Sequence, residues 1–148
     1  MIWKPNVTVA AVVERAGRFL LVEEEAGGEI VLNQPAGHWE QDESLIEGAI
    51  REALEETGYD FRPSALVGIY RWPHPKKEIT YLRFAFAGEV TGFDPARRLD
   101  EGIVRAVWLT PDEVRADTAR HRSPLVLRCV EDYLAGKRYP LDLLTHFD

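Results

Sequence analysis

Cysteine is almost absent from this sequence, which contains only Cys129 among its 148 residues. A single thiol cannot form a disulfide within the chain, and it cannot supply the cysteine ligands of a structural zinc site. Secreted folds stapled by disulfides are therefore excluded. Cys129 lies beside Val130 in an apolar segment, which favours a partly buried structural thiol.

Long apolar runs are missing as well. The N-terminal segment MIWKPNVTVAAVV carries a lysine, and Asn6 and Thr8 interrupt its apolar residues, so it is too short and too polar for a signal peptide or a membrane span. We find no internal repeat, low-complexity tract or linker. These absences predict a cytoplasmic protein without a membrane partner, and the length predicts a single domain over residues 1–148.

Positively charged residues are fewer than negatively charged ones. The chain has 18 lysines and arginines against 25 aspartates and glutamates, a net charge of −7. A protein that binds nucleic-acid polymers would show a basic face, so this class is not expected. A small phosphorylated substrate remains compatible with the acidic balance, because a bound divalent cation reverses the local sign of the charge. Both a monomer and a homodimer remain open.

The apolar pattern predicts strands, then a helix, further strands and C-terminal helices. Strands are expected over residues 6–14, 18–24, 66–72, 79–90 and 103–109. One helix is expected to end at Gly58, a second to start after Thr110 in a capping box, and a third to start at Ser123. This order predicts an α/β fold in which helices cover both faces of a mixed sheet.

The first of these helices is unusually acidic, although like charges one turn apart destabilise a helix. At about 100° per residue, three glutamates gather along one edge beside the apolar face. This glutamate edge consists of Glu52, Glu55 and Glu56. A solvated surface is the usual role of such a charge run. Carboxylates clustered beside an apolar face favour instead a site for a hard cation such as Mg²⁺, Ca²⁺ or Mn²⁺. Arg51 is expected to neutralise Glu47 in a separate row.

The same stretch, from Gly37 to Tyr59, resembles the Nudix box, Gx₅Ex₇REUxEExGU, in which U is an apolar residue. Its defining positions are filled by Gly37, Glu43, Arg51, Glu52, Glu55, Glu56 and Gly58, and Tyr59 is the last U. With ordinary amino-acid usage, a chance match in a chain of this length is on the order of one in a million. We call residues 37–59 the box.

The resemblance implies an α/β/α sandwich that hydrolyses a nucleoside diphosphate linked to another group. In that family one or more Mg²⁺ ions, for which Mn²⁺ is a possible substitute, are held by the glutamates matching Glu52, Glu55 and Glu56. The carbonyl of the residue matching Ala36 often joins these ligands. The residue matching Glu43 supports the metal site, and the one matching Arg51 orients the glutamates.

Outside the box, the resemblance implies that a glutamate on the loop before a late strand often acts as general base. This favours Glu101, which follows Asp100; an exposed loop acid and a box glutamate as base are the alternatives. Arg83 is a candidate phosphate ligand, and a structural ion pair is its alternative. Tyr81 and Trp72 are candidates for stacking on a base, although ordinary packing is the commoner role of such side chains.

Further likeness, in WKPNVTVAAVVERAGRFLLVEE, YLRFAF and GKRYPLDLL, points to one branch of bacterial Nudix phosphatases. That branch releases phosphate from nucleoside tri- and diphosphates and from the hydroxymethylpyrimidine pyrophosphate of thiamine biosynthesis. The resemblance therefore implies a Mg²⁺-dependent phosphohydrolase of this kind. The alternatives are a pyrophosphohydrolase of another nucleoside diphosphate derivative and a non-catalytic Nudix module that binds a nucleotide.

Overall fold

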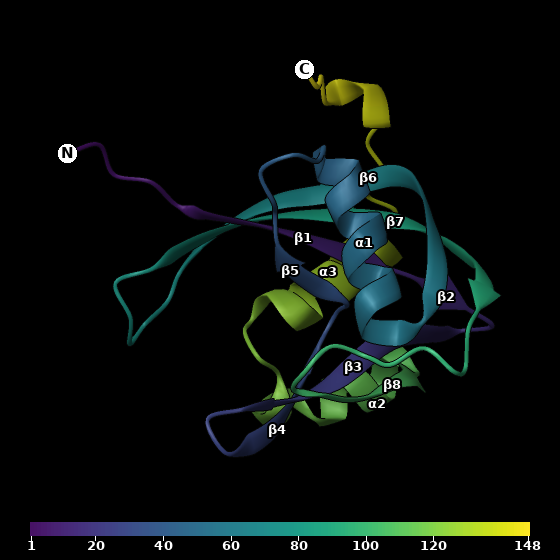
Figure 1. The fold of residues 1–148 in the computed structure, drawn as a ribbon. Coiled ribbons are helices and arrows are strands. Elements are labelled where there is room, and N and C mark those ends of the chain that lie inside the picture. Colours follow the sequence, from purple (N-terminus) through teal and green to yellow (C-terminus); the bar gives the residue numbers. More distant parts are fainter.

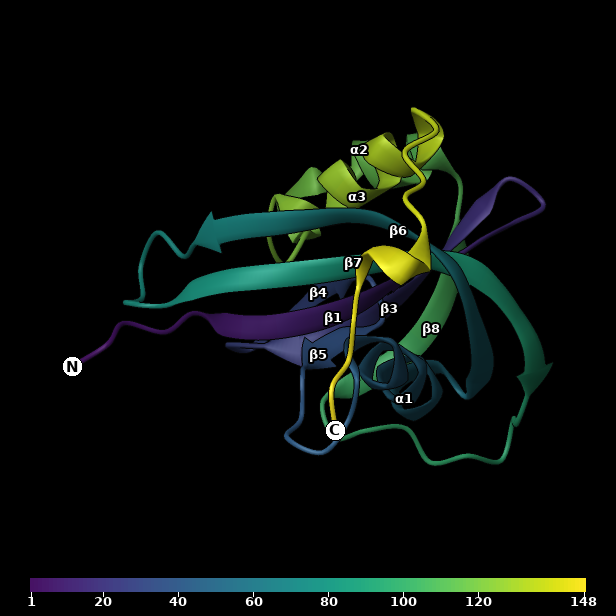
Figure 2. The same ribbon diagram turned by 90° about the horizontal axis from the view of Figure 1, so that it is seen from above.

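A computed structural model describes all residues from Met1 to Asp148. The elements form three layers, with α1 on one side of the strands and α2 and α3 on the other (Figure 1, Figure 2). The helices are α1 (Leu45–Thr57), α2 (Pro111–Ala116) and α3 (Leu125–Leu134), with short 3-10 helices at Thr118–Arg120 (η1) and Leu141–Leu143 (η2). This arrangement confirms the expected α/β/α sandwich.

Two sheets make the middle layer. The first is mixed, and the second is antiparallel. The first has the order β5 (Ala36–His38), β1 (Asn6–Val12), β7 (Thr80–Phe93) and β6 (Tyr59–Pro73). Strands β1 and β7 are parallel, and the other neighbours are antiparallel. The second sheet comprises β2 (Glu14–Arg15), β3 (Arg18–Ala26), β4 (Glu29–Asn33) and β8 (Ile103–Leu109), with β8 paired to β3.

The core has two halves because successive strand residues point to opposite faces. Along β1, Val9 and Ala11 pack toward α1, as does Val13 directly after the strand, whereas Ala10 and Val12 pack toward α3. Strand β7 alternates in the same way, so both faces of its middle part, Ala85 to Ala87, are buried. Arg83, on the α3-facing side in the middle of β7, therefore lies in a largely dry environment.

Strand β6 starts earlier than the sequence predicts. It begins at Tyr59, directly after α1, whereas the apolar pattern indicated a strand only from Leu66. Its register against β7 shifts at three places, one of them between Pro63 and Ala65. Such bulges break the two-residue alternation and bend the strand. A search for regular alternation therefore did not detect the N-terminal half of β6.

Helix α1 is fixed at both ends. The Ser44 hydroxyl accepts a hydrogen bond from the Glu47 N–H at 3.1 Å, and the Glu47 carboxylate accepts one from the Ser44 N–H at 2.8 Å. At the other end Gly58 adopts a φ of 78°, which favours glycine, and donates to the Leu54 carbonyl. Glu47 is thus part of the cap, and the expected neutralisation by Arg51 is not found.

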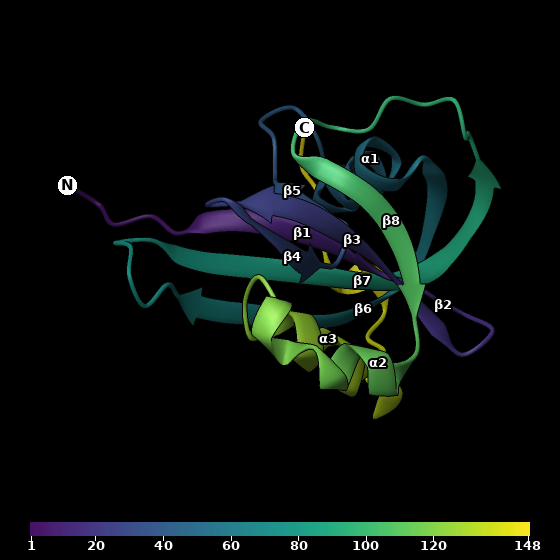
Figure 3. The same ribbon diagram turned by 90° about the horizontal axis from the view of Figure 1, so that it is seen from below.

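Helices α2 and α3 cover the opposite face of the sheet (Figure 3). Helix α2 starts with the expected capping box, in which Thr110 and Glu113 each accept a hydrogen bond from the other's N–H. On α3, Cys129 and Val130 are fully buried against the strands. No helix of the protein combines the length and the apolar character needed to cross a membrane.

Candidate metal centre and adjoining pocket

The glutamate edge of α1 packs directly against the backbone of β5. The Ala36 N–H donates to Glu56 Oε1 at 2.9 Å. A β-carbon at position 37 would collide with the carboxylate of Glu52, so only glycine allows this close approach. The box glycine and the box glutamates therefore form one packed unit, although fifteen positions separate Gly37 from Glu52 in the sequence.

Arg51 connects the acidic side chains. Its Nε donates to Glu43 Oε1 at 2.8 Å and its Nη2 to Glu43 Oε2 at 2.9 Å, a bidentate pair. Its Nη1 donates to Glu52 at 2.7 Å and to Glu55 at 2.7 Å, and its Nη2 also reaches the His38 carbonyl at 3.0 Å. These hydrogen bonds lower the pKa of Glu43 and raise the pKa of Arg51. The guanidinium thus holds several carboxylates in fixed positions.

Glu56 has no such cationic partner. The residue is 7% exposed, and burial raises its pKa to about 9, although the hydrogen bond from Ala36 acts in the opposite direction. Burial also raises the pKa of Glu52, against the lowering effect of Arg51. Buried carboxylates are unfavourable unless a positive charge compensates them. A cation at this edge would supply that compensation.

A loop residue joins the edge. Carboxylate oxygens of Glu52, Glu55 and Asp100 all lie within 4.8 Å of one another, and we call these three residues the carboxylate cluster. The Asp100 N–H donates to the Glu55 carbonyl at 3.0 Å, which fixes the loop against α1. Glu101, the acid that the sequence analysis favoured, is exposed and is not part of the cluster. Burial and the negative charge of Glu55 raise the pKa of Asp100.

The side chains of this cluster fit a hard divalent cation. Carboxylate oxygens are the preferred ligands of Mg²⁺ and Mn²⁺, and they converge here without a neutralising lysine. The single guanidinium of Arg51 is outnumbered by the acids around it. The donor set therefore agrees with the metal that the box resemblance implies.

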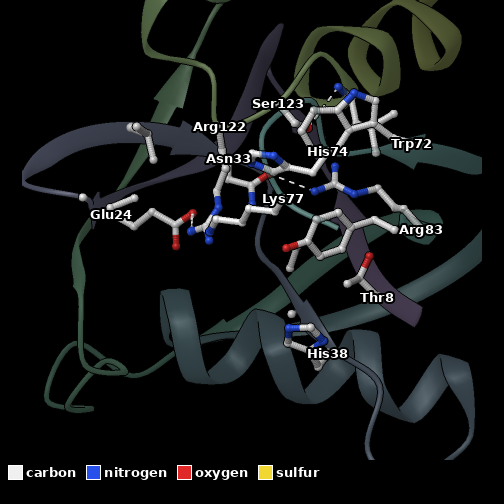
Figure 4. A pocket seen from close by; sticks show the side chains of 17 residues that line it. Thr8, Glu24, Asn33, His38, Trp72, His74, Lys77, Arg83, Arg122 and Ser123 are labelled. Atoms are coloured by element: carbon white, nitrogen blue, oxygen red, sulfur yellow. Dashed lines mark hydrogen bonds and ion pairs between the residues drawn. The ribbon is translucent and has the colours of Figure 1, made fainter. Parts of the chain in front are cut away.

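A pocket of about 480 Å³ opens next to β5 (Figure 4). It is lined by residues of β3, β4 and β5, by the end of β6 and the start of β7, and by the segment before α3. Ala36 and Gly37 line this pocket and also contact the glutamate edge, so the two sites share a wall. The pocket therefore adjoins the glutamate edge of α1.

The two aromatic candidates lie in this pocket. Trp72 of β6 and Tyr81 of β7 are cross-strand partners, and their rings are nearly parallel, with centroids 6.0 Å apart and an interplanar angle of 16°. The His74 ring lies 5.2 Å from that of Trp72. All three side chains are half-buried and line the pocket. Their rings present flat surfaces to a ligand in the pocket.

Arg83 lies deeper, where it is 6% exposed. It donates from Nη1 to Gln34 Oε1 at 2.8 Å and from Nη2 to Asn33 Oδ1 at 3.0 Å. No carboxylate lies within ion-pair distance of it, so the alternative of a structural ion pair is not found. The sequence analysis missed Asn33 and Gln34. Two adjacent amides directly after an apolar strand were the available signal.

Comparisons with known proteins agree with the motif. The NUDIX domain family model matches residues 4–129. The chain is 41% identical over 146 residues to Phosphatase NudJ of Escherichia coli strain K12, which covers 99% of this chain and 94% of that protein. A solved NUDIX hydrolase from Nitrosomonas europaea is 59% identical, with a TM-score of 0.96 over 97% of this chain and 98% of that one. A UDP-X diphosphatase, 18% identical with a TM-score of 0.75 over 95% of this chain and 68% of that one, shares the fold.

Proposed function

We propose that this chain, which belongs to the NUDIX family, is a Mg²⁺-dependent phosphatase of nucleoside tri- and diphosphates. Its membership of the family makes it a hydrolase of phosphorus-containing anhydrides. We propose hydroxymethylpyrimidine pyrophosphate as a further substrate. The observation that carries the proposal is the carboxylate cluster together with an adjoining pocket, in which Arg83 is buried without an acidic partner. The 41% identity to a phosphatase supports release of phosphate.

In this proposal, the glutamate edge and the Ala36 carbonyl would hold the metal. The ion supplies charge neutralisation for the phosphates and a lowered pKa for the water that it binds. Arg51 keeps the carboxylates of Glu52 and Glu55 in place before the ligand arrives. We propose Asp100 as the loop acid that accepts a proton from attacking water, because its carboxylate reaches the cluster; Glu101 and a box glutamate are the alternatives.

The remaining parts of the proposal follow from charge and size. The net charge of −7 suits a small phosphorylated substrate and disfavours nucleic-acid polymers. We propose a single domain over residues 1–148 that acts in the cytoplasm as a monomer or homodimer. The shared fold with enzymes of other substrates makes a pyrophosphohydrolase of a different nucleoside diphosphate derivative the alternative.

A substrate panel tests this proposal. We expect Mg²⁺-dependent release of phosphate from nucleoside tri- and diphosphates and from hydroxymethylpyrimidine pyrophosphate, with Mn²⁺ able to replace Mg²⁺ and a chelator abolishing release. The assay resolves phosphate from pyrophosphate, and ¹⁸O-labelled water identifies the phosphorus that is attacked. Pyrophosphate as the product, or a clear preference for a nucleoside diphosphate sugar, would favour the alternative. Tight nucleotide binding without hydrolysis would contradict both.

Proton release should accompany metal binding. Because the pKa of Glu56 is raised to about 9, its carboxyl is protonated near pH 7 in the metal-free protein. Its contribution to folding stability is therefore complete below pH 4.5 and is lost as the pH rises toward 9. A metal ion requires the charged form, so Mg²⁺ should displace about one proton at pH 7.

Isothermal titration calorimetry in two buffers of different ionisation enthalpy measures this proton directly. The observed enthalpy should differ between the buffers by about one buffer ionisation enthalpy. In a Glu56→Gln variant the difference should fall by about that amount, because the amide has no proton to release. Equal enthalpies in both buffers for the unmodified protein would show that Glu56 does not ionise when the metal binds.

A further inference from the structure

We propose that three polar side chains in the pocket bind the phosphate that stands between the metal-bound phosphate and the ring of the substrate. They are His38, Thr8 and Arg83, which we call the polar row. The inference rests on the proposed function, because it assigns a second phosphate of the same substrates. Nucleoside di- and triphosphates and hydroxymethylpyrimidine pyrophosphate all carry such a group.

The strand register places the polar row side by side. Thr8 of β1 is the partner of His38 of β5 on one side and of Arg83 of β7 on the other. Paired residues of neighbouring strands point to the same face of a sheet, with about 5 Å between the strands. Figure 4 shows the three side chains along one side of the pocket, with His38 nearest to α1. A group above Thr8 can therefore be contacted from three strands.

His38 connects the polar row with the metal site. Its carbonyl accepts a hydrogen bond from Arg51 Nη2 at 3.0 Å, and Arg51 also binds Glu52 and Glu55 of the carboxylate cluster. The neighbouring Gly37 packs against the Glu52 carboxylate. The backbone of His38 is thus fixed beside the cluster, whereas its ring lines the pocket. A phosphate chain that extends from the cluster into the pocket would pass this ring.

Two members of the polar row have no partner within the protein. The rings of the other three histidines each have a hydrogen-bonding or ion-pair partner, but the ring of His38 has none. The hydroxyl of Thr8 makes no hydrogen bond either, and neither group is sealed from solvent. An imidazole has at least one N–H in either protonation state, and a hydroxyl can donate. Both side chains can therefore donate to a phosphate oxygen.

Arg83 supplies the positive charge of the row. It is 6% exposed, and the amide oxygens of Gln34 and Asn33 hold it at 2.8 and 3.0 Å, which leaves N–H groups on Nε and Nη2 without a protein partner. Glu24, the acid that lines the pocket, is paired with Arg122 at 2.8 Å and does not neutralise Arg83. A buried cation is stabilised by an anion that accepts its hydrogen bonds. A phosphate meets this requirement.

The polar row lies between the metal site and an aromatic row. Ala36, whose N–H binds Glu56, is two positions before His38 on β5, and Tyr81 is two positions before Arg83 on β7, on the opposite side of the row. Tyr81 is stacked with its partner Trp72, with 6.0 Å between the ring centroids. Two residues of a strand span about 7 Å. A phosphate on the polar row thus lies between a metal-bound phosphate and a ring stacked on the aromatic row.

Adenosine monophosphate and adenosine test the inference, because they differ only in the phosphate. Titration calorimetry measures their binding in the presence of a chelator, so that no metal ion can hold the phosphate. The monophosphate should bind about tenfold or more tightly than the nucleoside, because hydrogen bonds to a charged group are strong. Thr8→Val removes the hydroxyl but keeps the shape of the side chain, and it should reduce this ratio to about threefold or less. His38→Ala should do the same.

Conservative variants separate binding from structural damage. Thr8→Ser keeps the hydroxyl and His38→Asn keeps an N–H donor, so both should retain more of the binding ratio than Thr8→Val and His38→Ala. His146→Ala is the matched control, since His146 lies outside the pocket and pairs with Asp148 at 3.4 Å. Its ratio should equal that of the unmodified protein. In the Mg²⁺-dependent reaction, Thr8→Val and His38→Ala should raise KM more than they lower kcat.

The outcomes separate this inference from the proposed function. Equal binding of the two ligands by the unmodified protein, or a ratio that Thr8→Val and His38→Ala leave unchanged, overturns the inference. Phosphate-dependent binding without any hydrolysis contradicts the phosphatase and leaves the inference in place. If neither ligand binds measurably, KM decides: an unchanged KM in both variants overturns the inference, and a raised KM that Thr8→Ser and His38→Asn partly restore supports it. Neither binding nor hydrolysis contradicts both.

Discussion

Glu56→Gln is expected to lower kcat/KM with Mg²⁺ about 10²- to 10³-fold or more without unfolding the protein. Glutamine keeps the shape of the side chain, and its oxygen can still accept the hydrogen bond from the Ala36 N–H. It removes the negative charge that the metal requires at a site where the carboxylate is 7% exposed. Glu55→Gln should act in the same direction. Steady-state kinetics and thermal melting, each with and without Mg²⁺, measure both effects.

Glu47→Gln is the matched control for these variants. It lies on the same helix, but its carboxylate accepts the Ser44 N–H in the capping box, where glutamine serves equally well. Its kcat/KM should stay within about twofold of the unmodified protein. Without Mg²⁺, Glu56→Gln should melt no earlier than the unmodified protein near pH 7, because glutamine cannot ionise on unfolding and so removes the cost of keeping a buried carboxyl protonated. Unchanged turnover in Glu56→Gln would refute the assignment of the metal site.

Arg51→Met should produce the largest loss of folding stability, about 3 kcal/mol in the free energy of unfolding without Mg²⁺. The substitution leaves Glu43, Glu52 and Glu55 without the guanidinium that they share at 2.7–2.8 Å. For a chain of this length the melting temperature should fall by about 6–12 °C. Mg²⁺ should restore part of the loss, because the ion replaces some of the missing positive charge.

Urea and thermal unfolding measure this loss. Arg105→Met serves as control, since its one ion pair with Glu23 involves an arginine side chain that is 68% exposed, and it should cost about 1 kcal/mol or less. Arg51→Lys should fall between the two, because lysine keeps the charge but cannot form the bidentate pair with Glu43. A melting temperature for Arg51→Met equal to that of Arg105→Met would show that Arg51 does not organise the acids.

The glutamate edge could be predicted from the sequence because its geometry is local. Positions three and four apart on one helix must lie side by side, and the caps at Ser44 and Gly58 bound that helix. The same rule was misleading for Arg51, because its spacing of four from Glu47 suggested an ion pair between these two residues. The cap had already engaged Glu47, and the longer reach of Arg51 connected it to Glu43, outside the helix.

Asp100 and Arg83 depended on contacts that no local pattern contains. The loop acid reaches the cluster because the Asp100 N–H donates to the Glu55 carbonyl, across 45 positions of sequence. Strand alternation placed Arg83 on one face of β7 but could not show that α3 covers that face. Its amide partners, Asn33 and Gln34, lie about 50 positions away. Long-range packing therefore decided which of the candidates outside the box entered the site.

The irregular register of β6 disfavours the pairing of two molecules of this protein along this strand at high concentration. Strand β6 forms an outer edge of the first sheet, and a regular edge invites another chain to add a strand. Here Pro63 lacks an N–H, bulges flank it, and both backbone groups of Leu66 are taken by Tyr139 from the C-terminal segment, each at 2.8 Å. The C-terminal segment thus occupies backbone groups of this edge that another chain would need in order to pair with it.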